Sequence, residues 1–193
     1  TTTFGITQAA LTVTANSGLS KVYGATDPTL TYTITGFVNG DVEGDLDTPV
    51  SISRASGENV ANYVVTPASA ADTNYSVSFV TSTFAITQAA LTVTPDVDQK
   101  KASGDTDPVL TYQLTSGSLI GSDAFSGALS GEVGEVTGPY AIQIGTLTAG
   151  SNYAITLIPT NFVIDVVVTT GVVTRSSKSV TVTGQVSSQI GIV

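Results

Sequence analysis

An internal repeat with a spacing of 80 residues constrains the fold of this chain more than any other feature of its sequence. Residues 1–14 (TTTFGITQAALTVT) and 81–94 (TSTFAITQAALTVT) are identical at twelve of fourteen positions. The same spacing aligns KVYGATDPTLTYTIT (21–35) with KASGDTDPVLTYQLT (101–115). Each copy must fold within its own length, so the sequence predicts two tandem modules of roughly 80 residues.

The repeat sets the expected domain boundaries. We expect a first module at 1–85, a second at 86–164 and a nonrepeating β-rich tail at 165–193. Residues 1–4 match the end of the first module. They are therefore expected to be the last strand of a preceding copy in a longer array.

Alternation of apolar and polar residues predicts strands throughout the chain. Leu30, Tyr32 and Ile34 share one face, and threonines occupy the other. β-Branched threonine favours strands, and turn-forming pairs such as Asn39-Gly40 separate them. A helical period is not sustained anywhere, although a single helical turn is expected near 41–46 or 121–126.

The predicted fold class is all-β. Each module is either an immunoglobulin-like sandwich or a β-grasp-like sheet with one short helical turn, and a β tail follows the second module. The run 84–94 contains no Gly or Pro. It predicts a short, stiff junction between the modules, unlike a Gly/Ser linker.

Composition excludes several classes of function. The chain has no Cys and no His, so thiolate nucleophiles, imidazole bases and Cys/His metal sites are excluded. The net charge is −9, with only 6 basic residues, which argues against nucleic acid or an anionic membrane as a partner. No apolar run is long enough for a membrane span. Threonine (32) and serine (21) supply most of the polarity.

No cofactor is expected, although two groups of carboxylates are candidate ligands of a hard cation such as Ca²⁺. The first is a loop with an acid at every second position, and the second lies beside the junction. Solvated acidic loops are the alternative for both groups and the expectation that we favour. The candidate ligands are Asp41, Glu43, Asp45 and Asp47 in the first group, and Asp96, Asp98, Asp105 and Asp107 in the second.

Other residues recur at equivalent positions in the two modules. Glu58 and Glu135 follow a glycine and are interpreted as turn residues rather than as paired catalytic acids. Lys21 and Lys101 are expected to be surface lysines rather than partners in isopeptide cross-links. The recurring tyrosines favour core packing over stacking on sugar rings. These tyrosines are at positions 32 and 112, 63 and 140, and 75 and 153.

The tail predicts a hairpin. VVVTTGVVT and SVTVTGQV are two strong β runs on either side of Arg175-Ser-Ser-Lys178-Ser. An isolated hairpin is marginally stable and has open edges. It either opens a further domain, packs on the second module, or donates a strand to a neighbouring copy.

Taken together, the motifs ITQAALTVT, KVYGATDPTLTYTITG, Gly-Glu before a tyrosine, and Asn-Tyr before a closing F-x-I resemble the MBG-type repeats (YGX class) of large bacterial surface adhesins. The resemblance covers about 1–165. In the second module Ser103-Gly104 replaces Tyr23-Gly24, and the loop near 117–131 is longer.

The resemblance implies a non-catalytic stalk segment of an extracellular adhesin or surface fibre on a bacterial cell. Neighbouring repeats or copies of the same chain are the implied partners. Two alternatives stay open. One is a filament subunit joined by strand donation from the tail, and the other is a module that binds a host or environmental glycan or protein through its loops.

Overall fold

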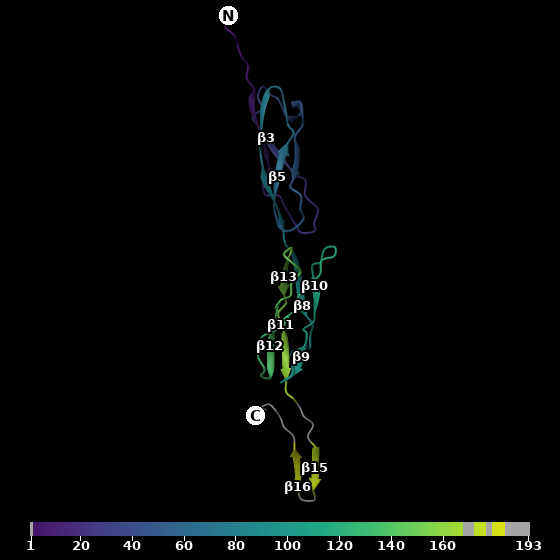
Figure 1. Cartoon of the computed structure of the whole chain (residues 1–193). Helices are drawn as coiled ribbons and strands as arrows, with labels where there is room; N and C mark the ends of the chain where they lie inside the picture. Colours follow the sequence, from purple (N-terminus) through teal and green to yellow (C-terminus); the bar gives the residue numbers. More distant parts are fainter. Residues whose placement is uncertain (1, 168–171, 177–178, 184–193) are drawn as a thin grey trace. The chain divides into compact units, whose positions relative to one another are not determined.

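The computed structural model describes residues 2–167, 172–176 and 179–183, and it is almost entirely β (Figure 1). The strands and one short helix are, in chain order, β1 (Ala9–Ala15), β2 (Ser20–Val22), β3 (Tyr32–Thr35), η1 (Glu43–Asp45), β4 (Ser51–Arg54), β5 (Ala61–Ala68), β6 (Tyr75–Val80), β7 (Ser82–Thr87), β8 (Ala89–Pro95), β9 (Lys100–Ala102), β10 (Tyr112–Ser116), β11 (Ser130–Gly131), β12 (Gly138–Gln143), β13 (Tyr153–Leu157), β14 (Asn161–Asp165), β15 (Val172–Ser176) and β16 (Ser179–Thr183).

The chain divides into two compact units. The first contains Thr1–Ala89 together with Ser151–Tyr153, and the second contains Ala90–Gly150 together with Ala154–Val193. Gln88 alone separates β7, which closes the first repeat, from β8, which opens the second. The predicted near-continuous run is therefore present as two strands with one residue between them.

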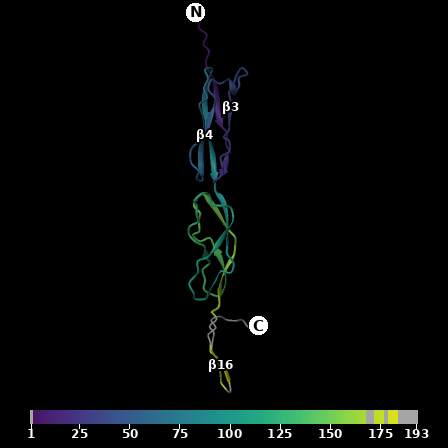
Figure 2. The same ribbon diagram turned by 90° about the vertical axis from the view of Figure 1, so that its right-hand side faces the viewer.

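The first module has two sheets, with strand orders β3-β1-β6 and β2-β7-β5-β4. Figure 2 labels β3 of the first sheet and β4 of the second. The chain passes from the first sheet to the second three times, between β1 and β2, between β3 and β4, and at Thr81 between β6 and β7. As a result β1 pairs in parallel with β6, and β2 pairs in parallel with β7. The strands that begin and end the module are therefore hydrogen-bonded neighbours.

The second module repeats this topology, with strand orders β10-β8-β13 and β11-β12-β14-β9. Parallel pairing recurs between β9 and β14. A register shift between Leu114 and Ser116 adds an irregularity to β10 that β3 lacks. Duplication of the sequence has thus produced duplication of the fold.

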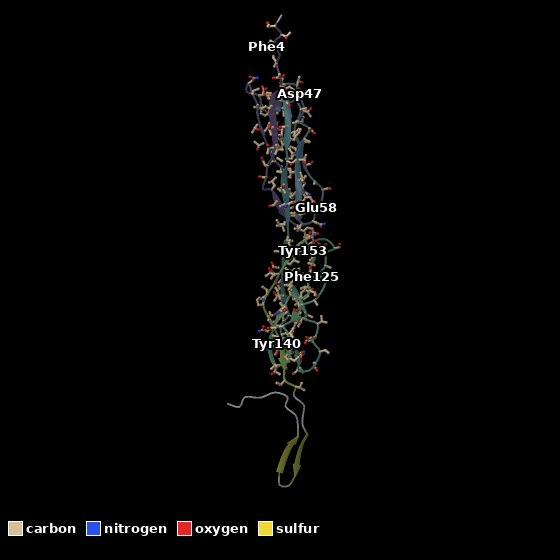
Figure 3. The ribbon with its side chains drawn as sticks, turned by 60° about the vertical axis from the view of Figure 1, so that its left-hand side comes forward. Phe4, Asp47, Glu58, Phe125, Tyr140 and Tyr153 are labelled. Carbon is tan, nitrogen blue, oxygen red and sulfur yellow. The ribbon has the colours of Figure 1, made fainter. Side chains whose placement is uncertain are left out.

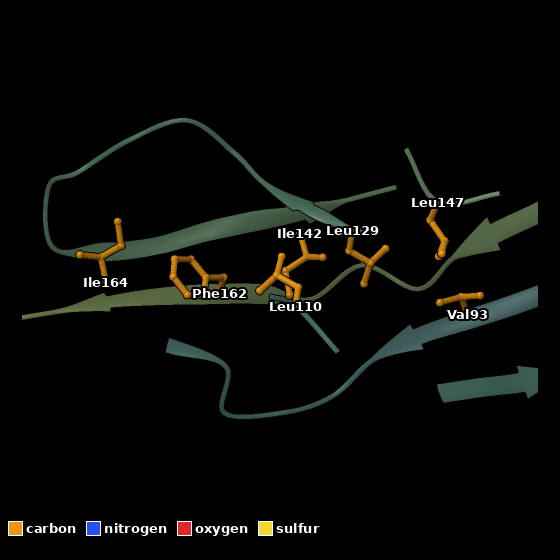
Figure 4. Packing of buried hydrophobic residues seen from close by; sticks show 7 residues of the cluster. All are labelled: Val93, Leu110, Leu129, Ile142, Leu147, Phe162 and Ile164. Carbon is orange, nitrogen blue, oxygen red and sulfur yellow. The ribbon is translucent and has the colours of Figure 1, made fainter. Parts of the chain in front are cut away.

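Each core lies between the two sheets of its own module. In the first module Ala15 of β1 packs in one cluster with Val65, Phe84 and Ile86 of the other sheet. The corresponding cluster of the second module is shown in Figure 4. It contains Val93, Leu110, Leu129, Ile142, Leu147, Phe162 and Ile164. Two facing sheets with a shared core make each module a sandwich, as the all-β prediction allowed.

The predicted helical turn is present at Glu43–Asp45 as a single 3₁₀ turn with no buried residue. It therefore adds nothing to the core, which distinguishes the module from a β-grasp sheet packed on a helix. The predicted tail hairpin is also present, because β15 pairs antiparallel with β16, from Val172↔Thr183 to Ser176↔Ser179. No helix among the described residues has the length and apolar character needed to cross a membrane.

Candidate functional site: a buried lysine with acidic partners in each module

The prediction of surface lysines at 21 and 101 is wrong. Lys21 is 8% exposed and Lys101 is 7% exposed. Each is the middle residue of a three-residue strand, β2 or β9, and strand alternation points it inward while its neighbour on either side points away from the core. A lysine in such a place buries its aliphatic stem but still requires partners for its ammonium group.

In the first module the partners of Lys21 are two carboxylates. Its Nζ lies 2.7 Å from Oδ1 of Asp27 and also forms an ion pair with Glu58. Arg54 of β4 forms ion pairs with the same two acids and donates a hydrogen bond to the carbonyl oxygen of Gly57 at 2.6 Å. Four charged side chains thus connect β2, the Asp-Pro loop, β4 and the turn before β5.

The second module contains a smaller cluster at the equivalent position. Nζ of Lys101 lies 2.6 Å from Oδ1 of Asp107 and 2.9 Å from both carboxylate oxygens of Glu135. It also donates to the carbonyl oxygen of Asp105 at 3.1 Å. The cluster connects β9 to the Asp-Pro loop and to the turn before β12.

The charges stabilise one another in their ionised forms. Hydrogen bonds from Arg54 first, and from Lys21 second, lower the pKa of Asp27 from 3.8 to about 2. Asp27 and Glu58 raise the pKa of Lys21, and Asp107 and Glu135 raise that of Lys101. Both lysines are therefore protonated ion-pair partners of these carboxylates.

The clusters also explain the repeated Gly-Glu before a tyrosine. The ring of Tyr63 lies against Gly57, where an added Cβ would come 2.4 Å from Cε1 of the ring. The Tyr63 hydroxyl donates to the carbonyl oxygen of Asn59 at 2.8 Å. Tyr140 packs on Gly134 in the same way and donates to the carbonyl oxygen of Val136. The glycine admits the ring, and the glutamate beside it reaches the lysine.

Five of the six recurring tyrosines are buried or pack on a core, as predicted. The sixth, Tyr32, is half-buried, belongs to neither core cluster and donates a hydrogen bond from its hydroxyl to Glu43. Tyr75 and Tyr153 are each 5% exposed. Tyr63 packs on the core of the first module, and Tyr112 and Tyr140 pack on the core of the second. Figure 3 shows Tyr140 and Tyr153 on the ribbon of the second repeat.

The acids of the first calcium candidate have separate partners. Tyr75 donates to Asp41 at 2.7 Å, and Tyr32 donates to Glu43. Asp45 accepts from the backbone N–H of Val42 at 2.9 Å at the start of η1. Asp47 accepts from both the N–H and the hydroxyl of Thr73 at 2.8 Å. Asp47 and Glu58 lie at opposite ends of the first module (Figure 3).

The acids of the second candidate are divided in a similar way. Asp107 belongs to the lysine cluster, and Asp96 accepts from Nε2 of Gln113 at 3.1 Å. Asp98 has a positive φ of 59°. Within the described ranges, no group of three or more Asp or Glu residues is placed so that it could hold a metal ion. Calcium binding stays a prediction for both groups.

A comparison with family models finds one family that matches this chain. The family model of the MBG domain (YGX type) matches the chain twice in tandem, at residues 11–85 and 91–163. The chain belongs to the MBG domain family. No curated protein and no solved structure shows a significant match to it. The matched residues contain both lysine clusters and, except for Ile86 and Ile164, both core clusters.

Sequence reasoning missed the lysine clusters, although a signal for them was present. Lys21, Asp27 and Glu58 of the first MBG domain each have a charged counterpart in the second. A charge that is retained in both copies of a repeat is under a constraint that a freely solvated charge lacks. The three-residue strands were too short for alternation to show that the lysine points inward.

Proposed function

We propose that this chain is a structural, non-catalytic segment in the stalk of a large extracellular bacterial adhesin or surface fibre. Membership of the MBG family supports an extracellular repeat module. The mechanical part of the proposal rests on the pairing of the first strands of a module with its last strands.

That pairing determines how a pulling force acts. β1 and β2 are the first two strands of the first module in the sequence, and β6 and β7 are the last two. β1 runs parallel to β6, and β2 runs parallel to β7. Opposite forces on the two ends therefore slide these parallel strands past each other. The hydrogen bonds of the ladder then share the load, whereas strands peeled from one end lose their bonds one at a time.

The lysine cluster adds to this resistance. Lys21 lies on β2, and its partners lie on the Asp-Pro loop and on the turn that precedes β5. Sliding of β2 along β7 would pull the ammonium group away from both carboxylates at once. Because the lysine is buried, the separation would leave a charge without compensation, which is strongly unfavourable.

Single-molecule force spectroscopy tests the proposal. The chain has no cysteine, so pairs of introduced cysteines provide unique attachment points. Pulling between sites at Thr2 and Thr87 shears the parallel strands. The matched control attaches at Ser51 and Ala68, which are partners at the open end of the β4–β5 hairpin, so that pulling unzips it.

We expect the first geometry to require a severalfold higher unfolding force than the control. Equal forces in the two geometries would contradict a mechanical role. Immunogold labelling of sectioned cells that express the full-length protein tests the location, and label confined to the cell interior would contradict a surface stalk.

The tail favours strand donation as a second candidate function. β15 and β16 form a two-stranded sheet in the described part of the tail. Such a sheet gains stability when its edge pairs with another strand, and a neighbouring copy of the chain is one source of that strand.

A further inference from the structure

The second module contains a pocket. In the first module, an arginine side chain occupies the equivalent place. The pocket has a volume of about 240 Å³. Apolar side chains and glycines form part of its wall, and carboxylates stand beside them. Its lining residues include Asp107, Leu110, Leu129, Gly131, Glu132 and Phe162. Leu110, Leu129 and Phe162 also belong to the core cluster shown in Figure 4.

Strand register identifies the equivalent place in the first module. Gly131 of β11 is the partner of Ile142, two residues after Tyr140. Arg54 of β4 is the partner of Val65, two residues after Tyr63. Since the two tyrosines are equivalent, Arg54 in the first module corresponds to Gly131 in the second.

In the first module this place holds the guanidinium group of Arg54. The Arg54 side chain is 9% exposed, and its guanidinium group lies 5.1 Å from the ring centre of Tyr63 and 5.3 Å from that of Phe84. It forms ion pairs with Asp27 and Glu58. Two aromatic faces and two carboxylates thus surround one planar cation.

The second module retains these surroundings without the cation. The four residues that surround Arg54 have equivalents in the second module, and two of these line the pocket, Asp107 and Phe162. The other two equivalents are Glu135 and Tyr140. In the first cluster two acids face Lys21 and Arg54, whereas in the second two acids face Lys101 alone. Glu132 adds a further carboxylate at the pocket. The pocket therefore carries excess negative charge.

We propose that this pocket binds the guanidinium group of an arginine side chain supplied from outside the second module. The planar fork of a guanidinium suits the carboxylates and stacks on an aromatic ring, which an ammonium group does not do equally well. This inference goes beyond the proposed stalk function and does not depend on it.

NMR titration of the whole chain with ethylguanidinium chloride tests the proposal, with ethylammonium chloride as the control at the same ionic strength. We expect saturable shifts at Phe162 and Gly131, with roughly tenfold weaker binding of the ammonium ion. The absence of saturable shifts, or equal binding of the two cations, would overturn the proposal.

Two substitutions in the second module sharpen the test. Gly131→Arg supplies the cation internally, and an added Cβ there meets only Cδ1 of Phe162, at 3.8 Å. This variant should abolish the ethylguanidinium shifts, and their persistence would contradict the assignment. Glu132→Gln removes a carboxylate that is outside the lysine cluster, and it should weaken binding severalfold. Unchanged binding in this variant would also count against the site.

The converse substitution uses the first module as the matched control. Arg54→Gly should create a second saturable site, with new shifts at Phe84 that are absent from the unaltered chain. If this variant does not fold, the two second-module variants still decide the proposal.

A final comparison identifies the source of the arginine once ethylguanidinium binding is established. Arg175 is the only arginine of the chain besides Arg54. If a second copy supplies the group, Arg175→Ala and Gly131→Arg will each reduce self-association in sedimentation velocity. If an unrelated peptide supplies it, self-association will not change, and an acetyl-Gly-Arg-Gly-amide peptide will displace ethylguanidinium.

Discussion

At the scale of single residues, the charges of this protein fall into two groups. Most of the acids are exposed and belong to one module only. The lysine cluster is different, because Lys21 and its acidic partners recur as Lys101 with Asp107 and Glu135. These ion pairs connect segments of each module that are far apart in the sequence.

The pH dependence of the first module should reflect Asp27. Its pKa of about 2 in the folded chain lies below its ordinary value of 3.8. The ion pairs therefore stabilise the module fully above about pH 4, and this contribution is lost as the pH falls from 4 to 2. Acid unfolding followed by NMR should show that Asp27→Asn removes this part of the pH dependence. An unchanged acid profile would contradict the assignment.

Two glycines are required by the close approach of a neighbouring strand. Gly36 has a φ of +109°, and an added Cβ would lie 2.3 Å from the carbonyl oxygen of Ala10. Gly117 meets Ala90 in the same way in the second module. We expect Gly36→Ala to destabilise the first module by more than about 1 kcal/mol, because it adds both strain and a clash. Gly40 also has a positive φ, but an added Cβ there would meet no other atom. In denaturant titration, Gly40→Ala should therefore lower the free energy of unfolding by less than Gly36→Ala does.

At the scale of secondary structure, the alternation of the sequence predicted the strands and the core well. The residues of β1 show this pattern, since Leu11 and Val13 are fully buried and Thr12 between them is not. The pattern could not show which strands pair. Parallel pairing of β1 with β6 and of β2 with β7 joins residues that are about 66 positions apart.

Two phenylalanines at equivalent positions of the repeat should differ in their contribution to stability. Phe84 of β7 is fully buried in the first core, so Phe84→Ala should cost about 3–5 kcal/mol in urea unfolding. Phe4 precedes the same ITQAALTVT motif but is 90% exposed. Phe4→Ala should leave the free energy of unfolding within about 0.5 kcal/mol of the unaltered chain.

The tail hairpin is the element whose role is most directly tested by removal. If β15 and β16 pair with a neighbouring copy, deletion of 166–193 should abolish polymers seen by electron microscopy at high concentration. The matched control is an internal change, such as Gly40→Ala, that leaves both the tail and the pocket of the second module intact. Polymers that persist without the tail would exclude strand donation.

At the scale of the whole chain, the organising fact is duplication. Two MBG domains follow each other with a single residue between β7 and β8. Residues 1–85 and 86–164 each carry seven acidic and two basic residues, whereas 166–193 carries two basic residues and no acid. Modules of like charge repel each other, and the repulsion weakens as salt is added.

Calcium binding is a question for the whole chain, because both candidate groups would contribute to one melting curve. We expect the same melting temperature in millimolar Ca²⁺ and in EDTA, since most of these acids already accept hydrogen bonds or form ion pairs within the module. Magnesium at equal concentration controls for ionic strength. A rise in melting temperature with Ca²⁺ alone would support a site, because a ligand that binds the folded state stabilises it.

The sequence by itself determined the repeat, the all-β class, the alternating core positions and the family, because each of these is a local pattern along the chain. Tertiary structure decided that Lys21 and Lys101 point inward, and that Arg54 and Gly131 occupy the same place in the two modules. Those facts depend on which strands pair and in what register. Pairing is set by contacts between residues far apart in the chain, and such contacts leave little trace in local alternation.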